Sequence, residues 1–396
     1  MELSIKHSNI SPSLTLAISA KAKKMQEDGI NVISFSVGEP DFNTPENIRN
    51  KAIDVIKNNN IGYTAVSGIP ALKEAICNKL KVDNDLIYNP KEIIVSNGAK
   101  HSLYNIFQAI CNPEDEVIIS TPYWVSYPEL VKMAGAKPIL IDCSEDNDFK
   151  YNIDDLRKNI TNKTKAIILT SPSNPTGSVY TLEELKEIAE LAVENNIIVV
   201  SDEIYEKLIY DNQNHISIAS LNEKIKELTI VVNGLSKCCA MTGWRIGYTA
   251  SNERIATIMS NLQSHATSNP NTIAQYAAIE ALEGDQSEIE YMRNEFDKRR
   301  IKMVELINAI PNISCNTPKG AFYVMVNISK LIGKKLGTYN IKDSMDFANY
   351  LLENSYVAVV PGVAFGNDNY IRLSYATSQE NIIEGLNRIK QTLSNI

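Results

Sequence analysis

The sequence predicts an α/β protein with a large domain, in which a mainly parallel sheet lies between helices, and a smaller α+β domain. Three observations support this. The chain has 396 residues, more than one hydrophobic core usually serves. Its middle alternates continuous valine and isoleucine runs with helical patterns. From about residue 286 the pattern changes to a long charged helix followed by short strands and further helices.

The apolar runs of the middle region are EIIVS, EVIIS, KAIILT, IIVVSD and TIVVNG, at residues 92–96, 116–120, 165–170, 197–202 and 229–234. Runs without polar alternation are typical of parallel strands that are buried on both faces. In such sheets ligands collect at the carboxyl ends of the strands. We therefore expect the functional residues to follow these runs directly.

The expected domain boundaries follow from the change of pattern. We assign residues 46–290 to the large domain and residues 1–45 and 291–396 to the small one. The first 45 residues are too few to form a domain of their own, so they are expected to pack on the small domain. That domain should contain a helix over 289–310, strand-like segments such as GAFYVMVN and YIRLSYA, a helix near 343–354 and a last helix.

Composition excludes several classes of protein. Hydrophobic residues make up 44% and charged residues 22%, which is ordinary for a soluble globular protein. The net charge of -8 argues against a nucleic-acid partner, which favours a basic surface. No apolar run approaches the roughly 18 residues that a membrane helix needs, and the amino terminus lacks the apolar core of a secretory signal. A cytoplasmic location is therefore expected.

The six cysteines form no Cys-x-x-Cys pair and lie in no zinc-binding spacing. No metal site is expected, and the thiols should be reduced. Cys238 and Cys239 are best interpreted as small packed residues, although a reactive pair beside Lys237 stays open as an alternative.

The most informative segment is NGLSKCCAMTGWRIGY, residues 233–248. Lys237 follows a strand and has small apolar neighbours. Partial desolvation lowers the pKa of such an amine and makes it a nucleophile toward an aldehyde. Arg245 could hold a phosphate nearby in a bidentate manner. Taken alone, Lys237 would more often be a surface lysine in a loop; its surroundings favour the chemical role.

A second segment, VSDEIYEKLIY, places Asp202 at the end of a buried run. A buried carboxylate needs a cationic partner, and a protonated pyridine nitrogen is one way in which proteins tune a cofactor. Tyr205 could reach the phenolic oxygen of the same ring. The alternative is that Asp202 caps the next helix.

Three further segments carry weaker signals. In SPSNPTG, Pro175 favours an extended Asn174 whose amide could face a ligand, although the motif can be a plain turn. Gly98 and Ala99 in SNGAK begin a helix after a strand, which is an arrangement suited to anions. Arg372 in YIRLSYA is an arginine within a strand, and it would need an anion such as a substrate carboxylate unless it lies on an exposed face.

Together these segments resemble the class I/II, fold-type I aminotransferases, and within them the bacterial aspartate aminotransferase subgroup. The similarity runs nearly end to end. It also includes the segments GEPDF (38–42), Tyr63 with GIP (68–70), PYWVSY (122–127), GAFY (320–323) and VPG (360–362). Each motif alone is only suggestive, but their order and spacing are specific.

The resemblance implies a role for each matching residue, with pyridoxal 5'-phosphate as the cofactor. Lys237 would form the Schiff base and carry protons, and Asp202 would pair with the pyridine nitrogen. Asn174 and Tyr205 would donate to the ring oxygen, and Trp124 would stack on the ring. The phosphate would be bound by Gly98, Ala99, Lys100 and Arg245. Tyr63 would reach the phosphate from the other subunit, which implies a homodimer with shared sites. Arg372 and Gly38 would hold the α-carboxylate.

One position departs from the family pattern. Some members have a phosphate-binding serine three residues before the lysine, where this chain has Gly234. Ser236 is expected to substitute for it in part.

The implied reaction transfers an amino group from an amino acid to a 2-oxo acid in a ping-pong cycle, with aspartate and 2-oxoglutarate as the expected pair. No arginine for a second carboxylate occurs in SNLQSHATSNPN (260–271). Lys100, with Ser13 and Thr15, is the expected substitute. Aromatic or prephenate-type substrates stay open, as does a carbon–sulfur lyase of the same fold. A transcription regulator would need a DNA-binding module, for which no room exists before Gly38, and every chemical position holds a competent residue, which argues against a scaffold.

Overall fold

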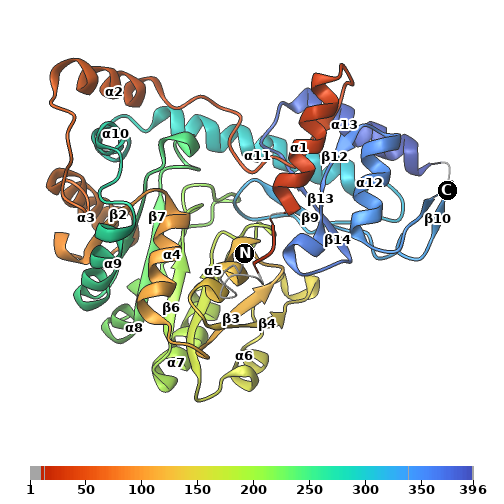
Figure 1. Ribbon diagram of the computed structural model, residues 1–396. Coiled ribbons are helices and arrows are strands. Elements are labelled where there is room, and N and C mark those ends of the chain that lie inside the picture. Colours follow the sequence, from red (N-terminus) through yellow and green to blue (C-terminus); the bar gives the residue numbers. More distant parts are fainter. Residues whose placement is uncertain (1–9, 13, 338, 395–396) are drawn as a thin grey trace, which may run out of the picture.

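A computed structural model describes residues 10–12, 14–337 and 339–394, without the side chains of 14–17. Its central feature is a seven-stranded sheet of order β2-β8-β7-β6-β5-β3-β4 (Figure 1). Only β8 runs opposite to its neighbours; the other strands are parallel. The strands are β2 (Ile93–Ser96), β3 (Glu116–Thr121), β4 (Lys137–Asp142), β5 (Thr164–Thr170), β6 (Ile198–Asp202), β7 (Thr229–Gly234) and β8 (Gly247–Ala250).

Helices cover both faces of this sheet. Successive strand residues point to opposite faces, and neighbours such as Ile167 and Ile168 accordingly belong to different apolar clusters. One cluster packs α4 (Ala99–Ile110), α5 (Ser126–Met133) and α9 (Glu253–Ala266) on the sheet. The cluster on the other face includes α6 (Ile153–Asn159), α7 (Leu182–Asn195) and α8 (Glu223–Leu228). This double cover explains why the strands read as continuous apolar runs.

The remaining helices extend the structure beyond the sheet. At the β2 edge, α10 (Thr272–Glu283) contacts both α2 (Glu46–Asn58) and α3 (Pro70–Asn84). The long helix α11 (Ser287–Asn308) then crosses toward the carboxyl-terminal part of the chain (Figure 1). There it packs against α13 (Gln379–Leu393).

The carboxyl-terminal part is built on a three-stranded antiparallel sheet of order β13-β14-β9. Its strands are β9 (Tyr323–Asn327), β13 (Val360–Pro361) and β14 (Tyr370–Ser374), and α12 (Ser344–Asn354) lies nearby. The amino-terminal segment joins this part: β1 (Ile33–Ser34) pairs with β12 (Val357–Ala358), and α1 (Leu14–Glu27) contacts β12 and β13. A short hairpin, β10 (Lys335–Leu336) with β11 (Tyr339–Asn340), completes it.

The α/β fold with a mainly parallel sheet is therefore confirmed, and each of the five apolar runs forms a strand. The structure differs in detail: β4 and β8 were not expected, and VAVVPG contains two short strands, β12 and β13, instead of one. The boundaries at 45/46 and 290/291 stay a prediction, although the packing of α1 and β1 supports the expected place of the amino-terminal segment.

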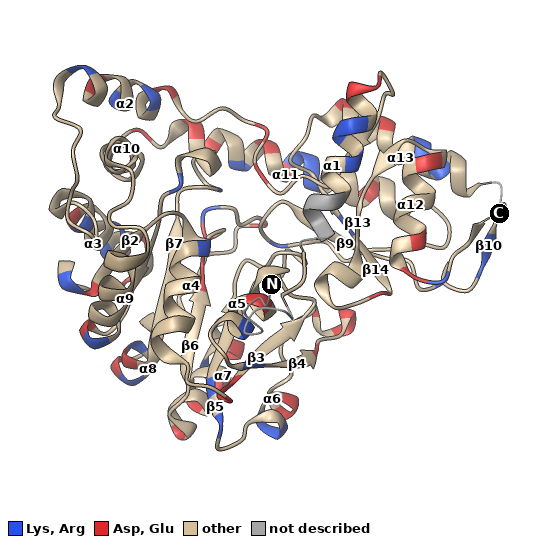
Figure 2. Ribbon diagram, viewed as in Figure 1, with Lys and Arg blue, Asp and Glu red and all other residues tan. Residues whose placement is uncertain are grey.

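Acidic and basic residues alternate over the outer helices (Figure 2), in keeping with the modest net charge. Among the described residues, no helix combines the length and apolar character that crossing a bilayer requires.

Candidate active site

The carboxyl edge of the central sheet and the three-stranded sheet enclose a cavity of about 600 Å³. It receives side chains from both parts of the chain. Those of sequence interest are Gly38, Ala99, Lys100, Trp124, Asn174, Asp202, Tyr205, Ser236, Lys237, Arg245 and Arg372. Most of the expected site residues therefore meet in one place, at the strand ends where they were sought.

Lys237 lies in the turn that follows β7, and its Nζ donates a 2.6 Å hydrogen bond to the Gly38 carbonyl oxygen. Burial lowers the pKa of the Lys237 amine to about 8, and the Arg372 and Arg245 guanidinium groups act in the same direction. A substantial fraction of the amine is then neutral near pH 8, which is the form that attacks carbonyl carbon.

Asp202 ends β6, and its side chain points into the cavity with the residue only 4% exposed. Its Oδ2 accepts a 2.7 Å hydrogen bond from the Tyr127 hydroxyl, and its Oδ1 accepts a longer one from the Ile204 amide. Burial raises the pKa of Asp202 to about 6, although the hydrogen bond from Tyr127 opposes the rise. The group is still ionised at neutral pH and has no cationic partner within ion-pair distance in the described chain, so it can receive one from a ligand.

Tyr205 is buried beside the same cavity, with its hydroxyl 3.0 Å from that of Tyr323. The Lys237 amine lies 6.0 Å from the centre of the Tyr205 ring. The hydroxyl pair thus lies near the amine, where it can donate to an oxygen of a bound ligand.

Arg372 is the central feature of the three-stranded sheet. It lies on the middle strand β14, is 3% exposed, and stacks 4.3 Å above the Tyr323 ring. Its Nη1 donates to Asn174 Oδ1 at 3.0 Å, its Nη2 donates to the Ser36 carbonyl oxygen, and its buried Nε has no partner. No carboxylate in the described chain forms an ion pair with it. A buried guanidinium that has no ion-pair partner and a free Nε is suited to bind the carboxylate of a ligand.

The amino end of α4 offers a second group of donors for an anion. Gly98 precedes the helix with a φ of 86°, and a Cβ there would lie 2.3 Å from Arg245 Nη2. Arg245 donates to the carbonyl oxygens of Thr242 and Asn97 and forms no ion pair within the described residues. The free amides of a helix amino terminus beside a guanidinium group are typical of phosphate sites.

The packing around Gly234 gives a physical reason why this chain has no serine three residues before Lys237. A Cβ at this position would lie 2.9 Å from the Ile246 carbonyl oxygen and 3.0 Å from the Gly247 Cα. A serine would therefore require the backbone to shift. Ser236 instead lines the cavity.

Lys100 lies on the first turn of α4 with its Nζ 4.9 Å from the centre of the Trp124 ring. Burial lowers the pKa of Lys100, and the nearby Arg245 adds to this effect. The ammonium group is directed to the cavity that it lines with Trp124, and a cation over an indole face is a stable arrangement.

For three expected residues the role stays a prediction. Tyr63 is 94% exposed and is absent from the lining, so its expected role in the partner's site stays a prediction. Ser13 lies outside the described residues. Thr15 belongs to α1, but its side chain also lies outside them.

The structure adds residues to which the sequence assigned no role. Tyr127 holds Asp202, Tyr323 contacts Tyr205 and Arg372, and Glu39 lines the cavity near Lys237. Tyr127 lies in the segment PYWVSY and Tyr323 in GAFY, two segments on which the family resemblance rests. Their place in these segments is the only feature of the sequence that could have pointed to a role for them.

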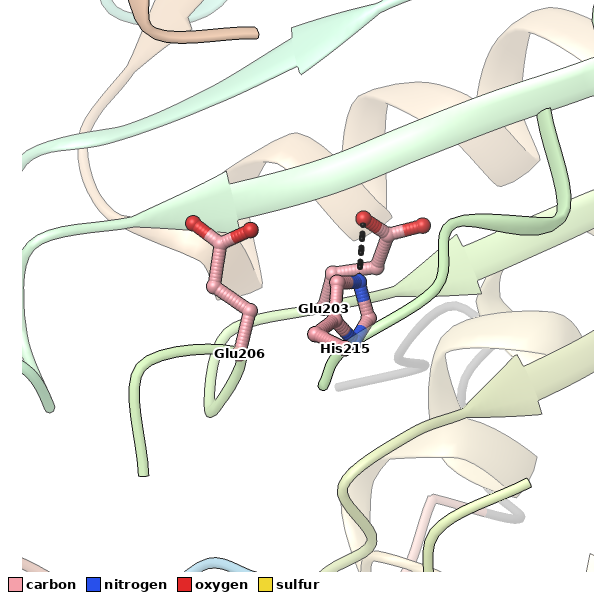
Figure 3. Close-up of side chains that lie close together, drawn as sticks. All are labelled: Glu203, Glu206 and His215. Atoms are coloured by element: carbon pink, nitrogen blue, oxygen red, sulfur yellow. Dashed lines mark hydrogen bonds and ion pairs between the residues drawn. The ribbon is translucent and has the colours of Figure 1, made fainter. Parts of the chain in front are cut away.

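Glu203, Glu206 and His215, which follow β6 in the chain, form a group of possible metal ligands (Figure 3). Glu203 already accepts hydrogen bonds from Ser201, Ser217 and His215. Glu206 pairs with the Lys79 ammonium, which holds the pKa of Glu206 at about 2 although burial acts to raise it. The Lys79 ammonium thus already supplies the positive charge that a metal ion would bring to Glu206. We therefore assign no metal to this group.

The fold and the cavity together define an enzyme that uses a desolvated amine on a small anionic substrate. Comparison with known proteins identifies the family. The model of the class I and II aminotransferases matches residues 30–389. The chain belongs to this family.

Individual relatives span the whole chain. An aspartate aminotransferase of Bacillus sp. (strain YM-2) is 52% identical and covers 96% of both chains. An aspartate/prephenate aminotransferase of Nitrosomonas europaea is 44% identical over the full length of both. The crystal structure of the aspartate aminotransferase from Rhizobium meliloti superposes with a TM-score of 0.96 at 39% identity, covering 100% of this chain and 99% of that one.

Enzymes of this family use pyridoxal 5'-phosphate, and the residues of the cavity fit this group. The amine of Lys237 suits the aldehyde, and the carboxylate of Asp202 suits the pyridine nitrogen. The indole of Trp124 offers a face for the ring. The helix terminus at Gly98 and the Arg245 guanidinium offer donors for the phosphate.

Proposed function

We propose that this aminotransferase moves the amino group of aspartate to 2-oxoglutarate. One observation carries the proposal: the Lys237 amine shares a cavity with an ionisable, unpaired Asp202 carboxylate and an unpaired Arg372 guanidinium. The names of the relatives support aspartate as the donor.

Each residue has a distinct task in this proposal. Arg372 binds the substrate α-carboxylate, with Asn174 fixing the orientation of its guanidinium. Lys237 Nζ removes the proton from the substrate Cα and later returns it, because burial keeps part of the amine neutral. Asp202, oriented by Tyr127, holds a proton on the ring nitrogen. The bound cofactor supplies an electron sink for the negative charge and carries the amino group between half-reactions.

Substrate choice is the finer part of the proposal. Lys100 would bind the side-chain carboxylate of aspartate, and Ser13 and Thr15 would assist. A lysine is a mobile point charge and could also move aside for an aromatic side chain. The name of the Nitrosomonas relative keeps prephenate as a second candidate acceptor.

Assembly and location belong to the same proposal. We propose a homodimer in which Tyr63 of one subunit completes the phosphate site of the other. The cytoplasmic location expected from the sequence stays a prediction.

The experiment compares amino donors with 2-oxoglutarate for the natural protein and for Lys100→Ala. A charge-assisted hydrogen bond contributes about 1.5–3 kcal/mol, so kcat/KM for aspartate should fall about 10- to 100-fold in the variant. The value for phenylalanine should stay the same or rise. Lys91→Ala, which changes an exposed lysine outside the cavity lining, is the matched control.

Two outcomes would contradict the proposal. Equal losses for both donors would assign Lys100 to the cofactor and remove the support for aspartate. Release of pyruvate and ammonia from an amino acid without any 2-oxo acid acceptor would favour a carbon–sulfur lyase.

A further inference from the structure

The loop between β7 and β8, residues 235–246, brings several cavity residues together. Ser236, Lys237, Thr242 and Arg245 all line the cavity from this one loop. Its backbone includes Ala240 with a φ of 49° and Arg245 with a φ of 58°. These left-handed conformations are uncommon for residues with side chains. Hydrogen bonds within the loop and contacts from outside it hold this shape.

Thr44 supplies two such contacts with a single hydroxyl. Its Oγ1 donates a 2.7 Å hydrogen bond to the Ala240 carbonyl oxygen and accepts a 3.0 Å hydrogen bond from Trp244 Nε1. The first hydrogen bond holds Ala240, which has a left-handed backbone. The second holds Trp244, the residue before the left-handed Arg245. Thr44 is 8% exposed, and it is not part of the cavity lining.

The chain just before Thr44 runs along the same loop. The Gly38 carbonyl oxygen accepts from Lys237 Nζ at 2.6 Å, and Glu39 Oε2 accepts from the Thr242 hydroxyl at 2.7 Å. Residues 38–44 and the loop therefore form one hydrogen-bonded unit. Among the hydrogen bonds that join these two described segments, those of Thr44 are the ones that use no cavity-lining side chain, and they reach the part of the loop between Lys237 and Arg245.

We propose that Thr44 is a positioning residue for the cofactor, which sets the spacing between Lys237 and Arg245 by holding Ala240 and Trp244. This inference rests on the proposed function, in which Lys237 takes the aldehyde end and Arg245 the phosphate end of the same molecule. Buried hydrogen-bonding groups that lose their partner are destabilised. Without the hydroxyl, the Ala240 carbonyl and the Trp244 indole would turn toward water and the loop would lose its shape.

The experiment measures cofactor binding by Thr44→Val and Thr44→Ser. Valine keeps the shape of threonine and removes both hydrogen bonds; serine keeps the hydroxyl. Apoprotein is titrated with pyridoxal 5'-phosphate and the visible absorption is followed. We expect the Kd to rise about tenfold for Thr44→Val and to stay near the natural value for Thr44→Ser. Trp244→Phe, which removes one of the two bonds, should give a smaller rise.

A second readout separates positioning from general stability. A looser loop admits water around Lys237, so the pH at which the visible band of the bound cofactor changes should move upward in Thr44→Val. Thr257→Val is the matched control, because it removes a threonine hydroxyl that bonds only the Glu253 carbonyl oxygen within α9. This control should change neither the Kd nor the spectral transition.

The outcomes distinguish the inference from the proposed function. If borohydride fails to fix the cofactor to Lys237 in the natural protein, the proposed function is wrong. If it succeeds, and both Thr44→Val and Trp244→Phe keep the natural Kd and spectral transition, the positioning role of Thr44 is refuted. Should Thr44→Val fail to fold, an unchanged Kd in Trp244→Phe decides against it.

Discussion

At the scale of the residue, Asp202 shows a conflict between stability and chemistry. Burial raises the pKa of this carboxyl to about 6, whereas an aspartate in an unfolded chain titrates near 4. The folded apoprotein therefore binds more protons than the unfolded chain between these two values. The contribution of Asp202 to stability is therefore greatest below about pH 4 and is lost as pH rises through about 6. At neutral pH the buried charge costs on the order of 3 kcal/mol.

Asp202→Asn should thus have opposite effects on stability and turnover. We expect the free energy of unfolding of the apoprotein at pH 7.5 to rise by about 2–3 kcal/mol, with little gain at pH 4. Transamination should fall at least about 100-fold, because a neutral amide cannot hold the ring nitrogen protonated. Urea unfolding at both pH values and steady-state assays test this.

The control for this substitution is Asp28→Asn, at an exposed position outside the cavity lining. It should alter neither property. An Asp202→Asn enzyme with near-natural turnover would rule out the electron-sink role of the carboxylate, and an equal stability change at both pH values would rule out its buried charge as the cause.

How much of the site the sequence could predict depends on where the contacts come from. Lys237, Asp202 and Arg372 stand directly in or after apolar runs, so their burial and need for partners could be inferred locally. Thr44 and Tyr127 act through residues about 200 and 75 positions away. No local pattern marks such contacts, because only the folded chain brings the partners together.

At the scale of the element, the start of α4 illustrates how a helix terminus and a neighbouring loop build one anion site. Gly98 has a φ of 86°, and its missing side chain leaves room for the Arg245 guanidinium. Two features therefore require glycine at position 98. One is the positive φ of its backbone, and the other is the close approach of the Arg245 guanidinium.

The two requirements can be separated by comparing Gly98→Ala with Gly333→Ala. Gly333 has a similar φ of 81°, but a Cβ there would meet nothing within 4 Å. Gly333→Ala should lose about 1 kcal/mol of unfolding free energy from backbone strain, and Gly98→Ala about 1–3 kcal/mol, because Gly98 combines a φ of 86° with a ψ of 159°. Only Gly98→Ala should also displace Arg245 and weaken the binding of pyridoxal 5'-phosphate, by about tenfold or more.

Denaturant unfolding of the apoproteins and spectroscopic titration with the cofactor measure the two effects. Equal cofactor affinities in the two glycine variants would show that Arg245 does not depend on the space beside Gly98.

Element prediction failed where a strand lacks the pattern of a buried parallel strand. β4 is an edge strand with exposed and half-exposed residues and a proline at its second position, so it does not form an apolar run. β8 has only four residues, begins with glycine and runs antiparallel to both neighbours. The positions of β4 and β8 in the sheet are determined by their pairing with other strands. This pairing cannot be predicted from the local sequence alone.

At the scale of the whole molecule, the expected homodimer depends on the region around Tyr63. This side chain is 94% exposed, and Ile53, Ile56 and Ile61, which precede it in the chain by ten residues or fewer, are 48%, 56% and 44% exposed. Exposed apolar side chains favour contact with another protein where they form a patch. A second copy of the chain would cover them and bring each Tyr63 to the partner's cavity.

Subunit complementation tests this arrangement most directly. Tyr63→Ala and Lys237→Ala should each be nearly inactive as homodimers. After subunit exchange, half of the dimers are mixed, and each mixed dimer has one site with both residues intact. An equimolar mixture should therefore recover about one quarter of the natural activity. A mixture of Lys237→Ala with Asp202→Asn is the matched control: both residues belong to the same subunit's cavity, so no intact site can form and no activity should return. If exchange is verified by mass spectrometry and the Tyr63 mixture recovers no more than this control, Tyr63 does not complete the partner's site, and the exposed apolar surface around it needs another explanation.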